Sequence, residues 1–281
     1  MKTELPENKI QIINLLEEYL RNSIDLEKQW ENTYIKKQID KRKEAKESFS
    51  LQDHIRGMVY SMLSSGVSWD RIIHNVDEKT GCIPAVDKIF FNYEVEKLSN
   101  VSPEELTNKI KEIRCGSQYT HKQMKALILA NIPKLRKLEQ KYGNIDTCYQ
   151  QWIGTDGDLK PLIKQLSDPY GENKMCQMGI PLICEYLKNV GYDVGKPDRH
   201  IRRILENDRL GFSDQKIVPE WEALDIIWDL AEKTGRSAAE VDYILWLYCA
   251  KGYGEVCTQK KTKCKKCVVR EFCLRKGEKF T

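Results

Sequence analysis

The sequence predicts an all-α fold with two lobes, and three observations lead to that prediction. Apolar residues recur at a period near 3.6 along most of the 281-residue chain, and helix-capping residues precede several of these stripes. No segment shows the sustained period-2 alternation of a half-buried strand. The length is sufficient for two packed lobes, each with an apolar core of its own. We therefore expect helices throughout and no β-sheet.

The first half of the chain is predicted to be a series of helices joined by turns. From Pro6 onward one apolar stripe is formed by Ile10, Ile13, Leu16 and Leu20, and such a helix should pack on a distant part of the chain. The charged segment 36–46 follows, and we interpret it as the seam between two lobes. Further helices are expected at about 55–63, 102–113 and 121–131, the last ended or kinked by Pro133.

The second half contains a hairpin between two expected helices. A glycine turn at 175–179 leads into an apolar stripe at 182–190, with Gly191 as the expected C-cap. Pro197 then stops any helix, and Asp198 stands where an N-cap would open the next one. The last helices are expected at 221–231 and 237–248, so the chain reads as helical up to its final segment.

Four cysteines close to the C-terminus lie near enough in sequence to bind one metal centre. They are Cys257, Cys264, Cys267 and Cys273, with six, two and five residues between them. Zinc and iron–sulfur clusters are both held by four thiolates, so the ligand type alone does not decide between them. Structural zinc sites usually consist of two close pairs, whereas only Cys264 and Cys267 form such a pair here. The spacing therefore favours an iron–sulfur cluster.

Two disulfides are the alternative use of these cysteines, and they would require an oxidising compartment. The sequence starts Met1-Lys-Thr-Glu-Leu-Pro without an apolar secretory leader, and the other cysteines are scattered singly. No apolar run approaches the roughly 18 residues of a membrane span. We therefore expect a monomeric protein of the reducing cytoplasm that has no membrane partner.

Positive charge is concentrated around the cysteines. The net charge of the chain is +4, but from Lys260 onward nine lysines and arginines stand against two glutamates. A solvated tail is the ordinary interpretation of such a run. A metal-bound loop would hold Lys260, Lys261 and Lys263 at fixed positions, which suits a phosphate backbone. We therefore expect these lysines to contact the phosphate backbone of a nucleic acid.

The order of motifs resembles the endonuclease III branch of the helix-hairpin-helix DNA glycosylases. A hairpin, an aspartate after proline and the pattern C-x6-C-x2-C-x5-C follow one another over about residues 175–273. The first half resembles the family only as a helical block of suitable length. The resemblance implies a [4Fe-4S] cluster on the four cysteines, a two-lobed helical fold, and a cytoplasmic enzyme associated with the nucleoid through its DNA substrate.

The resemblance also implies that Asp198 is the catalytic carboxylate. Breaking the base–sugar bond builds positive charge on the deoxyribose, and a fixed carboxylate can stabilise that charge and orient or deprotonate the attacking water. The other interpretation is that Asp198 only caps its helix, a role worth about 1 kcal/mol. One residue can do both. His200 matches a histidine of the family, and for it we expect a structural hydrogen bond.

The hairpin departs from the family at two positions. Bifunctional members carry a lysine two residues after the second hairpin glycine, which here is Gly179, and the lysine position holds Pro181. Proline offers no nucleophile, so the resemblance predicts a monofunctional glycosylase that leaves an abasic site. Lys174 and Lys196 lie nearby as substitutes. The first hairpin glycine is replaced by Gln177.

Base excision requires the nucleotide to be turned out of the stack, and side chains must fill the gap. Met175 occupies the place of the family's apolar wedge, and with Gln177 and Gly179 it makes up the expected DNA contact of the hairpin. In the family a second side chain fills the gap from the side opposite the wedge. That position is a glycine here, so Trp69 or a loop residue is expected to fill the gap instead. Tyr60 is the candidate for stacking on the flipped base.

Three segments make up the expected domain organisation. Residues 1–49 supply a helix and a connector that pack on the cluster lobe, residues 50–190 form the helical barrel lobe, and residues 191–281 carry the Asp198 helix and the cluster loop. Two alternatives stay open: a non-catalytic DNA-binding protein on the same scaffold, and a bifunctional glycosylase/lyase with a displaced lysine. The base is equally open among an alkylated purine, a deaminated base, a mismatch and a bulky modified pyrimidine.

Overall fold

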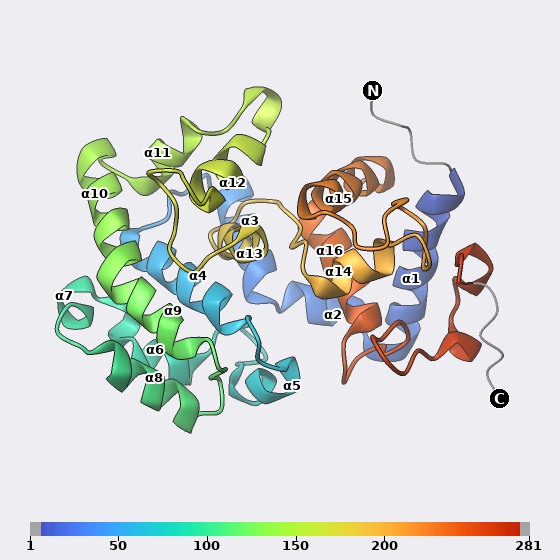
Figure 1. Ribbon diagram of the computed structural model, residues 1–281, viewed down its shortest axis with the longest axis horizontal. Coiled ribbons are helices and arrows are strands. Elements are labelled where there is room, and N and C mark those ends of the chain that lie inside the picture. The colour runs from blue at the N-terminus through green and yellow to red at the C-terminus, as the bar shows by residue number, and fades with distance from the viewer. Residues whose placement is uncertain (1–6, 276–281) are drawn as a thin grey trace. The chain divides into compact units, whose positions relative to one another are not determined.

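All regular secondary structure in the described part of the chain is helical, as the sequence predicts. The computed structural model describes residues 7–275, and no strand occurs within that range. These residues divide into two compact units (Figure 1). The central unit is the continuous segment 32–192, and the terminal unit combines residues 7–31 with residues 193–275. None of the helices in the described part is long and apolar enough to cross a membrane.

The terminal unit joins the first two helices of the chain to the last three. Its elements are α1 (Glu7–Ile24), α2 (Leu26–Glu31), α14 (Arg199–Leu205), α15 (Glu220–Thr234), α16 (Ala238–Cys249) and two 3-10 turns, η5 (Cys264–Lys266) and η6 (Arg270–Phe272). The predicted stripe of the first helix is buried, with Ile13, Leu16 and Leu20 at 0% exposure. This stripe packs α1 against α15 and α16, so segments from the two ends of the chain share one apolar core.

Contacts within the terminal unit fix the segment that leads into α14. Asp193 Oδ1 accepts a hydrogen bond of 3.0 Å from the backbone N–H of Ala239, near the start of α16. Gly195 lies so close to α15 that a Cβ there would stand 2.6 Å from Cδ1 of Ile227. The backbone just ahead of Asp198 is therefore positioned by the core of its own unit.

The central unit consists of short helices arranged around α4 and α13. Its elements are α3 (Tyr34–Glu44), α4 (Leu51–Leu63), α5 (Trp69–Ile72), η1 (Ile73–Asn75), α6 (Pro84–Ile89), η2 (Phe91–Tyr93), α7 (Val95–Leu98), α8 (Pro103–Glu112), α9 (Thr120–Ala126), η3 (Leu127–Asn131), α10 (Ile132–Tyr142), α11 (Ile145–Gln150), η4 (Thr155–Gly157), α12 (Lys160–Ser167) and α13 (Ile180–Asn189). The helix predicted at 55–63 is the second half of α4, and it is buried along its length.

Polar contacts on one face of α4 fasten α13, the helix that follows the hairpin. His54 Nδ1 lies 2.6 Å from the hydroxyl of Tyr186, and the Ser61 hydroxyl donates to the carbonyl of Leu182 at 2.6 Å. Between them the two helices approach closely, because a Cβ on Gly57 would stand 3.0 Å from a methyl group of Val190. The helix that follows the hairpin is therefore fixed to α4 at several points along its length.

A π-helical turn joins α9 to α10, where the sequence predicts that Pro133 ends or kinks a helix. The turn η3 directly precedes α10, and Pro133 is the second residue of α10. Proline has no N–H to donate to the preceding turn, and the wider π turn accommodates the missing bond. The helix axis therefore continues past Pro133 with a local distortion instead of ending there.

The boundaries between the two units differ from the lobe boundaries expected from the sequence. The divisions fall at 31/32 and 192/193, whereas the expected ones fall at 49/50 and 190/191. The first difference concerns the charged segment 36–46, most of which is the helix α3. Ile39 of α3 is buried at 3% exposure, and α3 packs on α13, so this helix belongs to the central unit.

A buried carboxylate, Asp146 at the start of α11, ties three segments of the central unit together. It accepts hydrogen bonds from Nη2 of Arg42 at 2.7 Å and from the backbone N–H of Phe49 at 2.6 Å. Its Oδ1 also lies 3.4 Å from Nε2 of His54. Burial works to raise the pKa of this carboxyl, but His54 and Arg42 outweigh burial and bring the pKa down to about 2.

We expect Asp146→Asn to lower the free energy of unfolding by about 2 kcal/mol near neutral pH. The folded pKa of about 2 lies below the ordinary 3.8, so the ionised carboxylate contributes stability above about pH 4 that is lost as the pH falls through 2. Urea denaturation over a pH series measures both effects. The variant should show a flatter pH dependence in this window, and the exposed Asp156→Asn is the matched control. Equal losses in the two variants would contradict the account.

Candidate active site and cysteine loop

The hairpin is a loop of the central unit that connects α12 to α13. Met175, expected as a protruding wedge, is instead buried at 0% exposure, because its N–H donates to the carbonyl of Leu166 at 2.9 Å and draws it into the core. Asn131 of η3 fastens the next residue, donating to the carbonyl of Cys176 at 3.1 Å and accepting from its N–H at 2.8 Å. Cys176 and Gln177 are left exposed at the tip.

The tip keeps a glycine-like turn although one glycine is replaced. Gln177 has a φ of +59°, in the left-handed region that glycine enters at least cost. Gly179 is the exposed N-cap of α13, and the N–H groups of Leu182 and Ile183 both donate to its carbonyl, at 3.0 and 2.9 Å. Pro181 has no N–H, so this helix start offers a phosphate fewer open donors than an ordinary one.

Asp198 is the N-cap of α14, as the sequence predicts. Its Oδ1 accepts hydrogen bonds from the backbone N–H groups of His200 at 2.7 Å and Ile201 at 3.2 Å. Its Oδ2 takes part in no hydrogen bond or ion pair with any other described residue, and the side chain is half-buried. The carboxylate is thus oriented through one oxygen and open to a ligand through the other.

His200 makes the structural contact expected of it. Its Nδ1 lies 3.1 Å from Nη2 of Arg203, and burial lowers the pKa of its imidazole. A neutral ring can accept a hydrogen bond from the guanidinium, which orients the arginine. Nη2 of Arg203 also donates to the carbonyl of Cys257 at 3.3 Å. The helix that starts at Asp198 is therefore joined to the first cysteine of the loop within the terminal unit.

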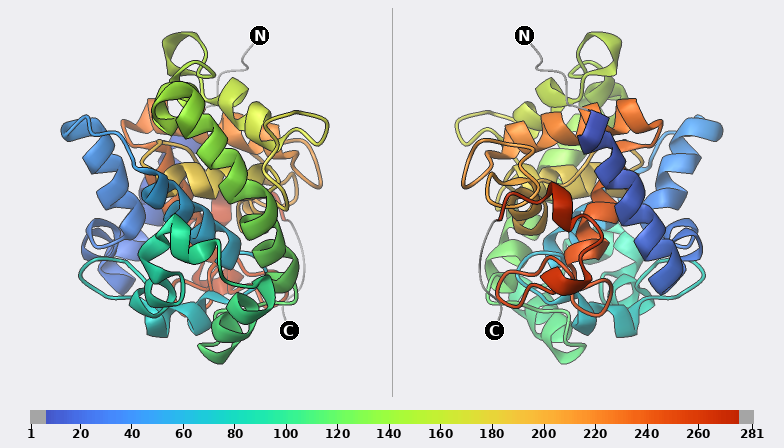
Figure 2. Two further views of the ribbon diagram at one scale, coloured as in Figure 1. Left: turned by 90° about the vertical axis from the view of Figure 1, so that its left-hand side faces the viewer. Right: turned by 90° about the vertical axis from the view of Figure 1, so that its right-hand side faces the viewer.

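The four cysteines of the C-terminal loop, Cys257, Cys264, Cys267 and Cys273, line one small cavity of the terminal unit. Mostly apolar side chains from α14, α16 and the loop line the rest of it, together with Arg209, Thr262 and Arg275. The loop lies against α1 (Figure 2). Among residues 7–275, no group of three or more His, Cys, Asp or Glu side chains is already arranged to hold a metal ion. The donor set itself suits a [4Fe-4S] cluster, since four cysteine thiolates are its usual ligands.

Two side chains donate to sulfur atoms of this loop. Nη1 of Arg209 lies 3.4 Å from Sγ of Cys257, and the hydroxyl of Tyr248 donates to Sγ of Cys267 at 3.3 Å. The neighbouring Cys249 thiol, and after it Arg209, outweigh burial and lower the pKa of the Cys257 thiol below its usual value. The donors to Cys257 favour the thiolate form that a metal requires. Burial instead raises the pKa of the Cys267 and Cys273 thiols, so of these three only Cys257 is shifted toward the thiolate in this way.

The basic residues of the loop differ in their surroundings. Lys260 and Lys261 are exposed and form no ion pair with other described residues. Lys263 is exposed too, but its Nζ lies 3.0 Å from a carboxylate oxygen of Glu255. The two unpaired lysines therefore carry more charge that is available to an anionic partner than Lys263 does.

The two residues predicted for a base pocket lie in different surroundings in the central unit. The Tyr60 side chain is 8% exposed, its hydroxyl donates to Asp87 at 2.8 Å, and the same oxygen accepts from the N–H of Ile83 at 2.7 Å. Because its hydroxyl bonds to both Asp87 and the N–H of Ile83, Tyr60 belongs to a buried hydrogen-bond network. Its ring is not exposed for stacking on a base. Trp69 begins α5 and is half-buried.

Three residues of these sites have no distinguishing signal in the sequence. Asn131 is only the last residue of a predicted helix, and its role depends on the π turn that directs it to Cys176. Arg209 and Tyr248 reach the cysteines through packing between segments that are distant in sequence. A lone arginine or tyrosine carries no spacing pattern, so composition and periodicity do not reveal such contacts.

No protein-family model and no curated protein sequence matches this chain. Two solved structures have a similar fold, with a TM-score of 0.52 each. One is Methanocaldococcus jannaschii 8-oxoguanine glycosylase/lyase in complex with a 15mer DNA containing 8-oxoguanine, at 19% identity, covering 85% of this chain and 96% of that one. The other is the 8-oxoguanine DNA glycosylase of the same organism, at 18% identity, covering 86% and 94%. The chain therefore has the helical fold of these two archaeal DNA glycosylases.

Proposed function

We propose that this protein is a DNA glycosylase that removes a damaged, mismatched or modified base from double-stranded DNA. The observation that carries the proposal is the arrangement of Asp198, with one oxygen committed to the cap of α14 and the other open. The similar fold of two proteins named as 8-oxoguanine glycosylases supports it. A carboxylate fixed in this way can meet a developing positive charge without first reorganising.

The proposed reaction is hydrolysis of the bond between the base and C1′ of the deoxyribose. The bond breaks with its electron pair on the base, and positive charge develops on the sugar. The free Oδ2 of Asp198 stabilises this charge and accepts a proton from the water that attacks C1′. The proton taken up by Asp198 is then returned, directly or through solvent, to the departing base, which regenerates the carboxylate. The products are the neutral free base and an abasic site. Because Pro181 cannot act as an amine nucleophile, we propose that the enzyme stops there and leaves the strand uncut.

A second candidate function is base excision followed by cleavage of the DNA strand. The observation that favours it concerns Lys174. Lys174 lies on the hairpin, and burial lowers the pKa of its amine, which increases the neutral fraction able to attack a sugar aldehyde. Its Nζ also donates to the carbonyl of Met178, a bond that would have to break first. Borohydride reduction decides between the two, since a covalent protein–DNA adduct that disappears in Lys174→Arg would replace the monofunctional proposal.

We also propose that the four cysteines hold a [4Fe-4S] cluster. Hydrolysis of a glycosidic bond transfers no electron, so the cluster would act as a structural centre for the loop. Arg209 and Tyr248 would donate to its thiolate ligands from the core of the terminal unit. The loop in turn presents Lys260 and Lys261, which we propose as contacts to the DNA backbone.

The function is tested on a panel of duplexes that each carry one altered base. The panel includes 8-oxoguanine, an alkylated purine, a deaminated base, a mismatch and a bulky modified pyrimidine. The native protein is expected to create an alkali-labile site in at least one duplex and not in the unmodified control. If it binds duplex DNA but creates no such site in any member, the non-catalytic DNA-binding alternative replaces the proposal.

Replacing Lys260 and Lys261 together by alanine should weaken duplex binding and reduce its salt dependence. The logarithm of the association constant falls linearly with the logarithm of the salt concentration, and each lost phosphate contact is expected to reduce the magnitude of that negative slope by about 0.9. The loss of affinity is therefore larger at low salt than at high salt. Fluorescence anisotropy over a salt series measures the slope. Lys263→Ala is the control, with a smaller effect because Glu255 already neutralises that lysine. An unchanged slope in the double variant would contradict these contacts.

A further inference from the structure

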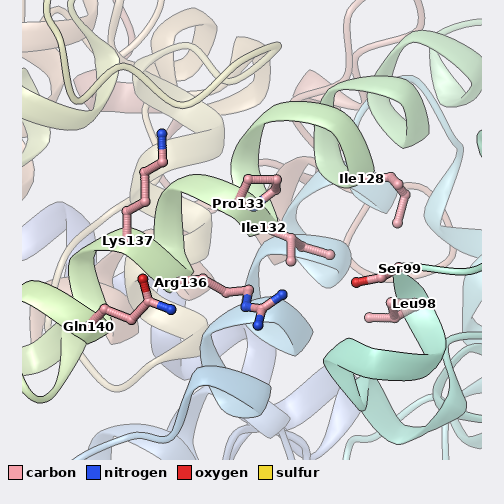
Figure 3. Close-up of a pocket in the computed structure, with 8 residues that line it drawn as sticks. All are labelled: Leu98, Ser99, Ile128, Ile132, Pro133, Arg136, Lys137 and Gln140. Atoms are coloured by element: carbon pink, nitrogen blue, oxygen red, sulfur yellow. The ribbon is translucent and has the colours of Figure 1, made fainter.

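The central unit contains a pocket of about 350 Å³ beside the π turn, and none of the proposed catalytic, cysteine or DNA-contacting residues lines it. Its floor is apolar and comes from Leu98 at the end of α7, Ile128 of η3, and Ile132 and Pro133 of α10. Figure 3 shows these side chains on the two sides of the pocket. A space of this size accommodates one or two apolar side chains or a small ligand.

The rim of the pocket is basic. Arg136 and Lys137 of α10 line it, are exposed, and form no hydrogen bond or ion pair with other residues in the part of the chain that the structure describes. In Figure 3 the guanidinium of Arg136 extends toward Ile132, whereas Lys137 points away from it. An apolar floor with open cations at one edge matches a ligand that combines an apolar group with negative charge.

The pocket uses a different face of the α9–α10 segment from the one that supports the hairpin. Ile128, Ile132 and Arg136 follow one another at intervals of four and all line the pocket. Asn131 instead bonds to Cys176, and Lys134 donates to the carbonyls of Glu172 and Lys174 at 2.7 and 2.8 Å. A ligand in the pocket would therefore leave the hairpin contacts in place.

We propose that this pocket docks a short acidic peptide segment of a partner protein. One apolar side chain of the segment would occupy the space between Leu98 and Ile132, and its flanking carboxylates would pair with Arg136 and Lys137. Charge complementarity selects this occupant, since the two open cations attract carboxylates and are exposed enough to reach them. Nucleic acid is the other anionic partner, but apart from the thymine methyl it offers little that would use an apolar floor.

The test uses the full chain and a labelled nonapeptide with a central leucine flanked by glutamates. Fluorescence anisotropy should show saturable binding that an unlabelled copy of the peptide competes away. A peptide with alanine at the centre, and one with lysines in place of the glutamates, should each bind at least about tenfold more weakly, equivalent to about 1.4 kcal/mol. Equal binding of the leucine and alanine peptides would overturn the proposal, because the apolar floor would then play no part.

Two variants locate the binding. The double variant Arg136→Glu/Lys137→Glu should bind the leucine peptide at least about tenfold more weakly than the native protein does. Lys122→Glu with Lys125→Glu makes the same charge change at exposed residues of α9 outside the pocket and should have little effect. Equal losses in the two double variants would overturn the proposal in favour of general charge attraction.

Two further measurements distinguish peptide binding in the pocket from effects on folding and from DNA binding. Ser99→Trp, at an exposed position on the pocket edge, should block the peptide by filling the space. Because it also removes the hydrogen bond of 2.8 Å from the Ser99 hydroxyl to the carbonyl of Val95, Ser99→Ala is the control, which should unfold at the same temperature as Ser99→Trp but keep peptide binding. Binding of an unmodified duplex should be the same in the native protein and in the Arg136→Glu/Lys137→Glu variant. If that variant loses duplex binding and the native protein binds no peptide, the surface serves DNA and the proposal is wrong.

Discussion

Asp198→Asn is expected to abolish base release while leaving the fold and DNA binding intact. Asparagine is as good an N-cap as aspartate, so α14 should begin at the same residue. It carries no charge for the developing cation and cannot accept a proton from water. A catalytic carboxylate typically contributes about 10² to 10⁴ in rate, and the single-turnover rate should fall by at least about a hundredfold.

The matched control for this substitution is Asp198→Ala, which removes the cap as well as the charge. It should lose activity to the same extent and in addition lower the free energy of unfolding by about 1 kcal/mol. Urea denaturation separates the capping role from the catalytic one, because only the alanine variant should be destabilised. If Asp198→Asn retains most of the activity of the native enzyme on its best substrate, Asp198 is a cap and nothing more.

Cys267→Ser is expected to remove bound iron and to destabilise the terminal unit. Cys267 packs against the apolar core of that unit, and its sulfur accepts a hydrogen bond from Tyr248. Losing a bound cluster should lower the midpoint of thermal unfolding by about 10 °C, since metal binding to such a loop contributes to folding directly. Iron analysis and visible absorption near about 400 nm report the cluster independently of enzyme activity.

The control cysteine is Cys176, which is exposed on the hairpin of the central unit and lies outside the loop. Cys176→Ser should keep the iron, the absorption and the unfolding midpoint of the native protein. A colourless native protein that contains zinc would show that the cysteine spacing was interpreted wrongly. Iron retained by Cys267→Ser would instead show that this residue is not a ligand.

Several helices were predictable because they depend on local sequence, whereas α3 was not, since its charged segment shows no apolar stripe. The stripe through Ile13, Leu16 and Leu20 and the cap at Ser237 are both present in the structure, and neither needs information from distant residues. The position of Asp198 at the start of α14 was predictable for the same reason, as Pro197 and the following apolar residues define that helix start.

The surroundings of the site residues were not predictable, because they depend on contacts between distant segments. Met175 occupies a place where the family resemblance implies a wedge, yet its hydrogen bond to Leu166 places it in the core. Tyr60 is predicted to stack on a flipped base, yet its hydroxyl donates to Asp87 of another helix, which the sequence does not pair with it. Periodicity tells which face of a helix is buried but not which side chains meet there.

The free base is the product that tests the central claim most directly. We predict that incubation of the native protein with the best duplex of the panel releases the intact altered base, in a one-to-one ratio with abasic sites measured by an aldehyde-reactive probe. Mass spectrometry identifies and quantifies the released base. Strand breaks without free base, or no release from any duplex by a folded protein that binds DNA, would contradict the claim that this chain is a DNA glycosylase.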